Sequence, residues 1–238
     1  MAELITQDLA RHFGGLVALT GVDTEIHKDE IVGLIGPNGA GKTTYANCVS
    51  GMYLPSKGKV LFQGKDISAM QAFERCRIGI GRTFQLVRPL QELSLLENIM
   101  LGCMFGCGKS KKEAKKKGEE LCEFMSLEKL ERGVANLTAL EIKKLEIARA
   151  LATEPRLLFL DEVMAGLNGE ETMQMIELVR RINSRGITII IIEHVMKVIS
   201  ELTHRVIVLD WGQVIAKGPY SEVSNNPEVI SAYLGEEE

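Results

Sequence analysis

The sequence has no hydrophobic run long enough to cross a membrane. Its longest apolar run lies near Ile187–Ile192, whereas a membrane-spanning helix needs about 20 apolar residues. The first residues, Met1–Thr6, include Glu3 and show neither a cationic start nor an apolar core, so we expect no secretory signal. The sequence therefore predicts a protein that is neither inserted in a membrane nor secreted.

Cysteines are few, and neither sign of charge dominates. The five cysteines form an odd set without a Cys-x-x-Cys pair, which favours reduced thiols in a cytosolic protein over disulfides or a zinc site. The 28 Lys and Arg residues nearly balance 32 Asp and Glu, for a net charge of −4, which argues against a nucleic-acid binder. The 45% hydrophobic and 25% charged residues indicate a globular protein and exclude disorder, collagen and coiled coil for the whole chain.

The 238 residues suit one large domain. Residues 1–35 alternate as in a small sheet, and Ile31–Ile35 is expected to be a buried strand. After residue 138, the apolar segments RLLFL, ITIIII and RVIVLD alternate with helical patterns. This alternation predicts an α/β fold whose mainly parallel sheet is covered on both faces. Residues 1–85 and 138–238 would form this core, with a β part at the N-terminus.

Residues 86–137 differ from this pattern and are expected to form a helical insert. A basic run, KSKKEAKKK, leads into apolar positions at helical spacing, including Ala114, Leu121 and Met125. This predicts an amphipathic helix with a solvated basic face. Contact of that face with an anionic membrane surface or with a partner's groove is the alternative.

The segment Gly36–Thr43, GPNGAGKT, matches the pattern G-x-x-x-x-G-K-[ST]. It stands between an expected strand and an expected helix, which is the context that the pattern requires. Its glycines allow backbone N–H groups to converge on phosphate oxygens, and the helix N-terminus adds positive partial charge. Lys42 should reach the β- and γ-phosphates, and the Thr43 hydroxyl should ligate Mg²⁺. We therefore predict a nucleoside triphosphate site rather than a glycine-rich turn that only caps a helix.

Two carboxylates follow the expected strand Leu157–Leu160. Asp161 can hold Mg²⁺ at the carboxyl end of a parallel strand. Glu162 can orient or deprotonate the attacking water, a role worth about 10²–10⁴-fold in rate. His194 ends another strand and is expected to link the γ-phosphate to Glu162, and Phe13 is expected to stack on the base. A surface acidic pair and a structural histidine are the plain alternatives.

These residues resemble the nucleotide-binding subunit of an ABC transporter. The resemblance rests on Gly36–Thr43, on Gln85 in TFQ, and on the segments LEIARAL, LLFLDE, AGLN and EHVMK. The segments RHFGGLVAL and GIGRTFQ and the ending AYLGE are similar to the ATP-binding subunits of branched-chain amino acid importers. Asn168 stands where many members of the family have Asp.

The resemblance implies a P-loop NTPase core of the RecA-like kind, with an N-terminal antiparallel β part and a helical part over residues 86–137. It implies ATP and Mg²⁺ as cofactors, with Gln85 joining the metal to the membrane-subunit interface. Glu162, His194 and Gln85 would be catalytic, and Thr43, Gln85 and Asp161 would hold the metal. The expected nucleotide contacts are Phe13, Gly36, Pro37, Asn38, Gly39, Ala40, Gly41, Lys42, Thr43 and Thr44.

The resemblance also implies partners. Two such subunits would enclose two ATP molecules, on the inner face of the cell membrane. The segment Leu86–Met100 and the helical insert would receive a coupling helix from a transmembrane permease subunit. A separate solute-binding protein would act only indirectly, and no nucleic acid is expected.

The family signature Leu-Ser-Gly-Gly-Gln is altered here to Leu137-Thr138-Ala139-Leu140-Glu141. Thr138 and Glu141 can still form a capping box at the start of a helix. Two glycines that approach the partner's γ-phosphate are lost, however, and Glu141 would face phosphate with like charge. Because this defect affects the partner's site, we expect a heterodimer rather than a homodimer.

Other functions are open at this point. The altered signature permits an ATP-gated clamp that dimerises with little or no hydrolysis, although Glu162 and His194 oppose it. A soluble ABC ATPase that acts on DNA or ribosomes would usually have two cassettes or long coiled coils. A P-loop kinase needs neither His194 nor a signature helix. The transported solute is not encoded in these residues, so branched-chain amino acids are implied by resemblance alone.

Overall fold

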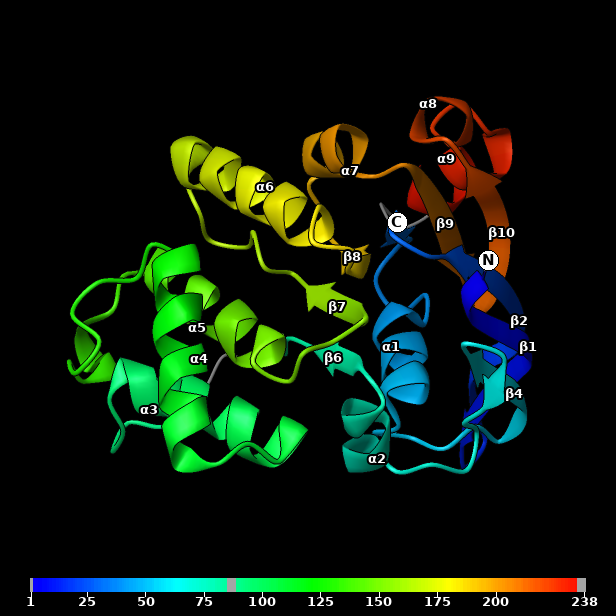
Figure 1. The fold of residues 1–238 in the computed structure, drawn as a ribbon. Coiled ribbons are helices and arrows are strands. Elements are labelled where there is room, and N and C mark those ends of the chain that lie inside the picture. Colours follow the sequence, from blue (N-terminus) through cyan, green and yellow to red (C-terminus); the bar gives the residue numbers. More distant parts are fainter. Residues whose placement is uncertain (1, 85–88, 235–238) are drawn as a thin grey trace.

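The computed structural model describes residues 2–84 and 89–234, and it shows two β-sheets with helices on both sides of the larger one (Figure 1). In the six-stranded sheet the order is β10-β9-β3-β8-β7-β6. Its strands are β3 (Ile31–Ile35), β6 (Ile80–Arg82), β7 (Leu157–Asp161), β8 (Thr188–Ile192), β9 (Arg205–Asp210) and β10 (Gln213–Gly218). All neighbours run parallel except β10, which pairs antiparallel with β9. The predicted mainly parallel α/β sheet is confirmed.

The second sheet is antiparallel, in the order β2-β1-β4-β5. Its strands are β1 (Ala2–Phe13), β2 (Leu16–His27), β4 (Lys57–Phe62) and β5 (Lys65–Asp66). The antiparallel N-terminal part is therefore as predicted, and β1 and β2 are long strands broken by bulges. Bulges insert residues that disturb the alternation of apolar and polar positions along these strands.

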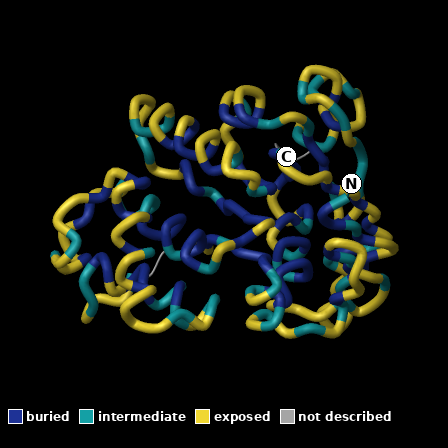
Figure 2. The backbone as a smooth tube through the Cα atoms, in the orientation of Figure 1, coloured by how far each residue is buried: buried dark blue, intermediate teal, exposed yellow. Residues whose placement is uncertain are grey.

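Apolar side chains of the central strands alternate between two cores. Leu158, Ile189 and Val208 belong to the core on the side of the helices α3 to α7. Phe159 and Ile190 point to the opposite core, shared with α1 and the antiparallel sheet. Figure 2 shows this central region as a continuous buried zone. Burial on both faces explains why these strands read as uninterrupted apolar runs.

The helices are α1 (Lys42–Ser50), α2 (Ala72–Arg77), α3 (Leu95–Leu101), α4 (Lys111–Phe124), α5 (Ala139–Leu151), α6 (Gly169–Asn183), α7 (Met196–Leu202), α8 (Tyr220–Val223) and α9 (Pro227–Leu234). A short π-helix, Gly102–Gly106, continues α3, and a 3₁₀ turn spans Val134–Asn136. None of these helices, within the described part of the chain, is long and apolar enough to cross a membrane. Helix α6 begins at Gly169, because the Asn168 side chain accepts the N–H groups of Glu170 and Glu171.

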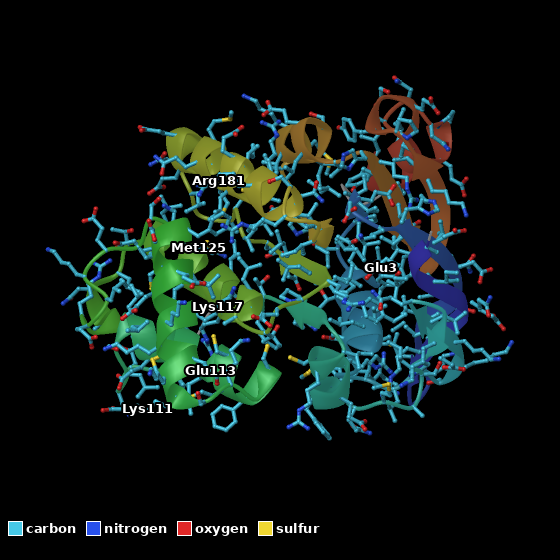
Figure 3. All side chains as sticks on the ribbon, in the orientation of Figure 1. Glu3, Lys111, Glu113, Lys117, Met125 and Arg181 are labelled. Carbon is cyan, nitrogen blue, oxygen red and sulfur yellow. The ribbon has the colours of Figure 1, made fainter. Side chains whose placement is uncertain are left out.

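The basic run of the insert lies on α4, beside α3 and α5 (Figure 1). Ala114, Leu121 and Cys122 face the core, while Lys111 and its neighbours are exposed. Figure 3 shows Lys111, Glu113 and Lys117 along this helix. The predicted amphipathic helix with a solvated basic face is confirmed.

Candidate active site

The phosphate-binding segment Gly36–Gly41 connects β3 to α1, as the sequence predicts. Gly36 has φ +145°, and a Cβ there would lie 2.0 Å from the backbone oxygen of Leu209. Gly41 has φ +100°, and its Cβ would lie 2.8 Å from the oxygen of Ala18. Only glycine fits these two positions, because an L-residue would be strained in conformation and would collide with backbone. The loop is thereby fixed against β9 and β2.

Lys42 and Thr43 open α1 at the end of this loop. The Lys42 ammonium donates to the backbone oxygens of Gly36 and Pro37, both at 2.6 Å. Thr43 is exposed. The N-terminus of α1 thus brings a cation, a hydroxyl and backbone N–H groups to one point, which is an arrangement suited to the charged oxygens of a phosphate.

The hairpin between β9 and β10 supports the loop from outside. The Gly212 N–H donates to the oxygen of Ala40 at 3.0 Å, and the Gly212 oxygen accepts from Thr20 at 2.9 Å. The neighbouring Trp211 has φ +44° and is 85% exposed. Sequence reasoning missed this tryptophan; a lone Trp directly before Gly in a turn was the available signal.

Asp161 ends β7 and is almost fully buried. Its N–H donates to the Thr83 hydroxyl at 2.9 Å, and its Oδ2 lies 3.6 Å from an Arg82 nitrogen. Burial raises the pKa of this carboxyl, and Arg82 opposes the rise. Oδ2 has no hydrogen bond from any residue that the structure describes. A buried carboxylate oxygen without a donor suits a divalent cation.

The residues present therefore fit Mg²⁺. Asp161 and the Thr43 hydroxyl would be the oxygen donors on this chain, and phosphate oxygens and water would complete the coordination. The bound ion would neutralise charge on the transferred phosphoryl group. Gln85, the third expected ligand, lies outside the described residues. Within residues 2–84 and 89–234 there is no cluster of three His, Cys, Asp or Glu side chains arranged for a metal.

Glu162 and His194 come together although they belong to different strand ends. The His194 Nε2 and the Glu162 Oε1 are 2.7 Å apart. Glu162 has φ +50°, and its N–H donates to the oxygen of Ile192 at the end of β8. The backbone oxygen of Glu162 accepts a hydrogen bond from the Lys143 ammonium of α5 at 2.9 Å. The parallel register of β7 and β8, which pairs Asp161 with Ile192, thus delivers the predicted carboxylate–histidine pair.

A cavity of about 370 Å³ joins these groups. It is lined by the phosphate loop with the start of α1 and by residues from four other places in the chain: Phe13, Leu16, Val17, Ala18, Asn38, Gly39, Ala40, Gly41, Lys42, Thr43, Thr44, Glu162, Ile192, His194, Trp211 and Gly212. Phe13 is held edge-on to Tyr53, with ring centroids 5.1 Å apart, and Arg11 lies over its face. Of the expected nucleotide contacts, Gly36 and Pro37 do not line this cavity. The stacking role of Phe13 stays a prediction.

The altered signature segment starts α5. The Thr138 hydroxyl accepts the Glu141 N–H at 3.2 Å, and the Glu141 carboxylate accepts the Thr138 N–H at 2.9 Å. The predicted capping box is confirmed. Glu141 also forms an ion pair with Arg132; burial raises its pKa, but these hydrogen bonds and Arg132 outweigh that effect and lower it. Arg132 thus offsets part of the negative charge of Glu141, and the expected repulsion between Glu141 and a partner's phosphate stays a prediction.

Comparisons with known proteins agree with this geometry. The profile of the family described as "ABC transporter" matches residues 19–165, and that of "Branched-chain amino acid ATP-binding cassette transporter" matches residues 213–238. The chain is 37% identical to the high-affinity branched-chain amino acid transport ATP-binding protein LivG of Escherichia coli, over 98% of both chains. It is 36% identical to the corresponding protein BraF of Pseudomonas aeruginosa, over 96% of both.

Solved structures give the same answer for the fold. A nucleotide-free ATP-binding cassette from an ABC transporter superposes with a TM-score of 0.90 at 31% identity, covering 98% of this chain and 99% of that one. The ADP conformation of an ABC transporter cassette gives 0.88 at 32% identity, covering 99% of both chains. With the phosphate loop, the buried Asp161 and the Glu162–His194 pair in one place, we conclude that the chain belongs to the ABC transporter family of ATP-hydrolysing subunits.

Proposed function

We propose that this chain hydrolyses ATP to drive the import of branched-chain or related amino acids through separate membrane subunits. The observation that carries the proposal is the 2.7 Å contact between Glu162 and His194 beside the phosphate loop. This pair can hold a water molecule for attack on a γ-phosphate that Lys42 and Mg²⁺ position. A clamp that binds ATP without hydrolysis would not need the pair. The solute class comes from the printed names of the LivG and BraF relatives.

A groove between α2, β6, the π-helix and α5 is our candidate docking site for the membrane subunit. It measures about 560 Å³ and is lined by α2, the end of β6, the π-helix and α5. Three phenylalanines on it are exposed: Phe73 at 60%, Phe84 at 48% and Phe105 at 73%. Exposed aromatics around a groove are typical of a surface that packs against a partner. We propose that an amphipathic helix of a permease subunit lies here, which places the chain on the cytoplasmic face of the membrane.

The second ATPase is proposed to be a different chain. Ala139 and Leu140 put side chains where a close approach to a partner's phosphate needs glycine. This chain's own phosphate loop, Asp161 and Glu162 carry no such change. A partner with an intact signature would therefore complete the site on this chain, while the reciprocal site would be weak.

Uptake and hydrolysis measured together test the proposal. Cells that lack this gene should lose uptake of labelled leucine, isoleucine or valine, and the wild-type gene should restore it. Glu162→Gln should not restore uptake, and the purified complex that contains it should lose at least about 100-fold in ATP turnover while ATP still binds. Phe105→Ser should weaken co-purification of the permease subunit. Normal uptake with Glu162→Gln would overturn the proposal.

A further inference from the structure

A buried carboxylate between the groove and the metal ligand has no role so far. Glu146 lies in the middle of α5, with 6% of its surface exposed, and it lines the groove of Phe84 and Phe105. One of its oxygens accepts the backbone N–H of Phe84. The other oxygen has no hydrogen bond from any residue that the structure describes. Burying a carboxylate costs free energy unless the group is well hydrogen-bonded. The contact of Glu146 with Phe84 therefore needs an explanation.

Phe84 directly follows two residues that hold Asp161. Arg82 places one guanidinium nitrogen 3.6 Å from the Asp161 Oδ2 and donates from another to Asn47 and Ser50 of α1. The Thr83 hydroxyl accepts the Asp161 N–H at 2.9 Å, and the Thr83 N–H donates to Phe159. Residues 82–84 are thus bound to Asp161 on one side and to Glu146 on the other.

We propose that Glu146 is a positioning residue that holds the Phe84 backbone and, through Arg82 and Thr83, sets the position of the metal-ligating carboxylate of Asp161. Because Glu146 and Phe84 also line the groove, an occupant of the groove acts on the same hydrogen bond. The identity of the groove's occupant rests on the proposed function. The effect on the metal rests on Asp161 as its ligand.

The charges around Glu146 support an acceptor role. Lys143 and Arg149 of its own helix lower its pKa, whereas burial and Asp161 raise it. Arg82, on the neighbouring strand, feels the charges of both Asp161 and Glu146. The carboxylate therefore interacts with the cations Lys143, Arg149 and Arg82 as well as with the charge of Asp161. Loss of its acceptor oxygen frees the Phe84 N–H and removes the attachment of residues 82–84 to α5.

The test compares Glu146→Met, which removes the acceptor at similar length, with Glu146→Gln, which keeps an acceptor oxygen. The measurement is the affinity for the non-hydrolysable analogue AMP-PNP, with Mg²⁺ and with EDTA. We expect wild-type protein to bind more tightly with Mg²⁺. Glu146→Met should shrink that Mg²⁺-dependent gain by about tenfold, the loss expected when a hydrogen bond to a charged group is removed. Glu146→Gln should stay within about twofold of wild type, on the same reasoning.

Ile147→Val is the matched control, because Ile147 is the next residue on α5, is also buried, and has an apolar side chain that cannot accept the Phe84 N–H. It should lower the melting temperature and leave the Mg²⁺ gain unchanged. A folded Glu146→Met with the wild-type Mg²⁺ gain would overturn the proposal, and so would a wild type without any gain. If wild type shows the gain but supports no uptake, the proposed function fails while the positioning role of Glu146 stands.

Discussion

Glu162 and His194 are 32 positions apart, and their contact depends on where two strands end. Each stands one or two residues after an apolar strand, so both could be selected from the sequence as candidates. Glu162 adopts φ +50°, a conformation that costs a non-glycine residue about 1–2 kcal/mol. The strain is held by its N–H bond to Ile192 and by Lys143. Strained residues that neighbours hold in place are typical of active sites.

The buried carboxylate of Glu146 should make the stability of the protein depend on pH. Burial raises its pKa from 4.5 to about 7, so the folded protein binds a proton there more tightly than the unfolded chain does. The carboxylate therefore costs stability as the pH rises from about 4.5 through 7. The difference in free energy of unfolding between Glu146→Gln and wild type should therefore shift in favour of the variant from pH 5 to pH 8. The expected size of this shift is about 1–3 kcal/mol.

Urea denaturation of both proteins at pH 5 and pH 8 measures this difference. The control is Glu113→Gln, because the exposed Glu113 has a lowered pKa owing to its bonds with Ser110. Both pH values lie above the ordinary pKa of a glutamate side chain, so that substitution should change the free energy of unfolding by nearly the same amount at pH 5 and at pH 8. An equal difference between Glu146→Gln and wild type at both pH values would contradict the predicted shift.

Helix α5 carries two features in sequence: the capping box of Thr138 and Glu141 at its start, and Glu146 further along. The capping box persists although the signature has changed around it, because it satisfies donors within the helix itself. Capping is thus separable from contact with a partner's phosphate. The N-terminus of α5 stays formed, while Ala139 and Leu140 alter what it presents.

The caps of α5 and α4 allow a matched prediction. Ser110 forms the same capping box with Glu113 at the start of α4. Thr138→Ala and Ser110→Ala should each lower the free energy of unfolding by about 1 kcal/mol, measured by thermal or urea denaturation. Neither substitution should lower ATP turnover of the assembled complex by more than about twofold, because in the proposed heterodimer the start of α5 faces the weak reciprocal site. A large turnover loss with Thr138→Ala alone would contradict the proposed weakness of that site.

For the whole molecule, the altered signature predicts how two ATPases pair. With Glu162→Gln to prevent hydrolysis and ATP present, this chain alone should remain monomeric in size-exclusion chromatography with light scattering. Restoring glycine with Ala139→Gly and Leu140→Gly should produce an ATP-dependent dimer of this chain. The reason is that glycine permits backbone N–H groups to approach a phosphate that a side chain keeps away.

The control for pairing is the same double variant without nucleotide, which should stay monomeric. The lone Trp211, exposed beside the phosphate loop, gives a second readout through its fluorescence. An ATP-dependent dimer formed by the chain with its natural Ala139 and Leu140 would contradict the proposed heterodimer.

Local sequence was sufficient for the elements that local physics decides. The phosphate loop, the buried strands β3, β7 and β8, and the capping box at Thr138 each follow from residues within a few positions of one another. Glycine spacing, apolar runs and short polar side chains fix them through backbone geometry and burial. The roles of Asp161, Glu162 and His194 could be proposed because the ends of parallel strands meet at one edge.

Only the tertiary structure decided which charges are paired. Arg132 balances Glu141, Arg82 and Thr83 hold Asp161, and Glu146 holds Phe84 across 62 positions. Strand β6 is three residues long, too short for any periodicity to reveal it. Such contacts join segments that are distant in the chain, and their partners depend on packing rather than on the neighbouring residues. The sequence by itself determined the nucleotide site; how that site connects to the groove depends on the way β6, β7 and α5 pack together.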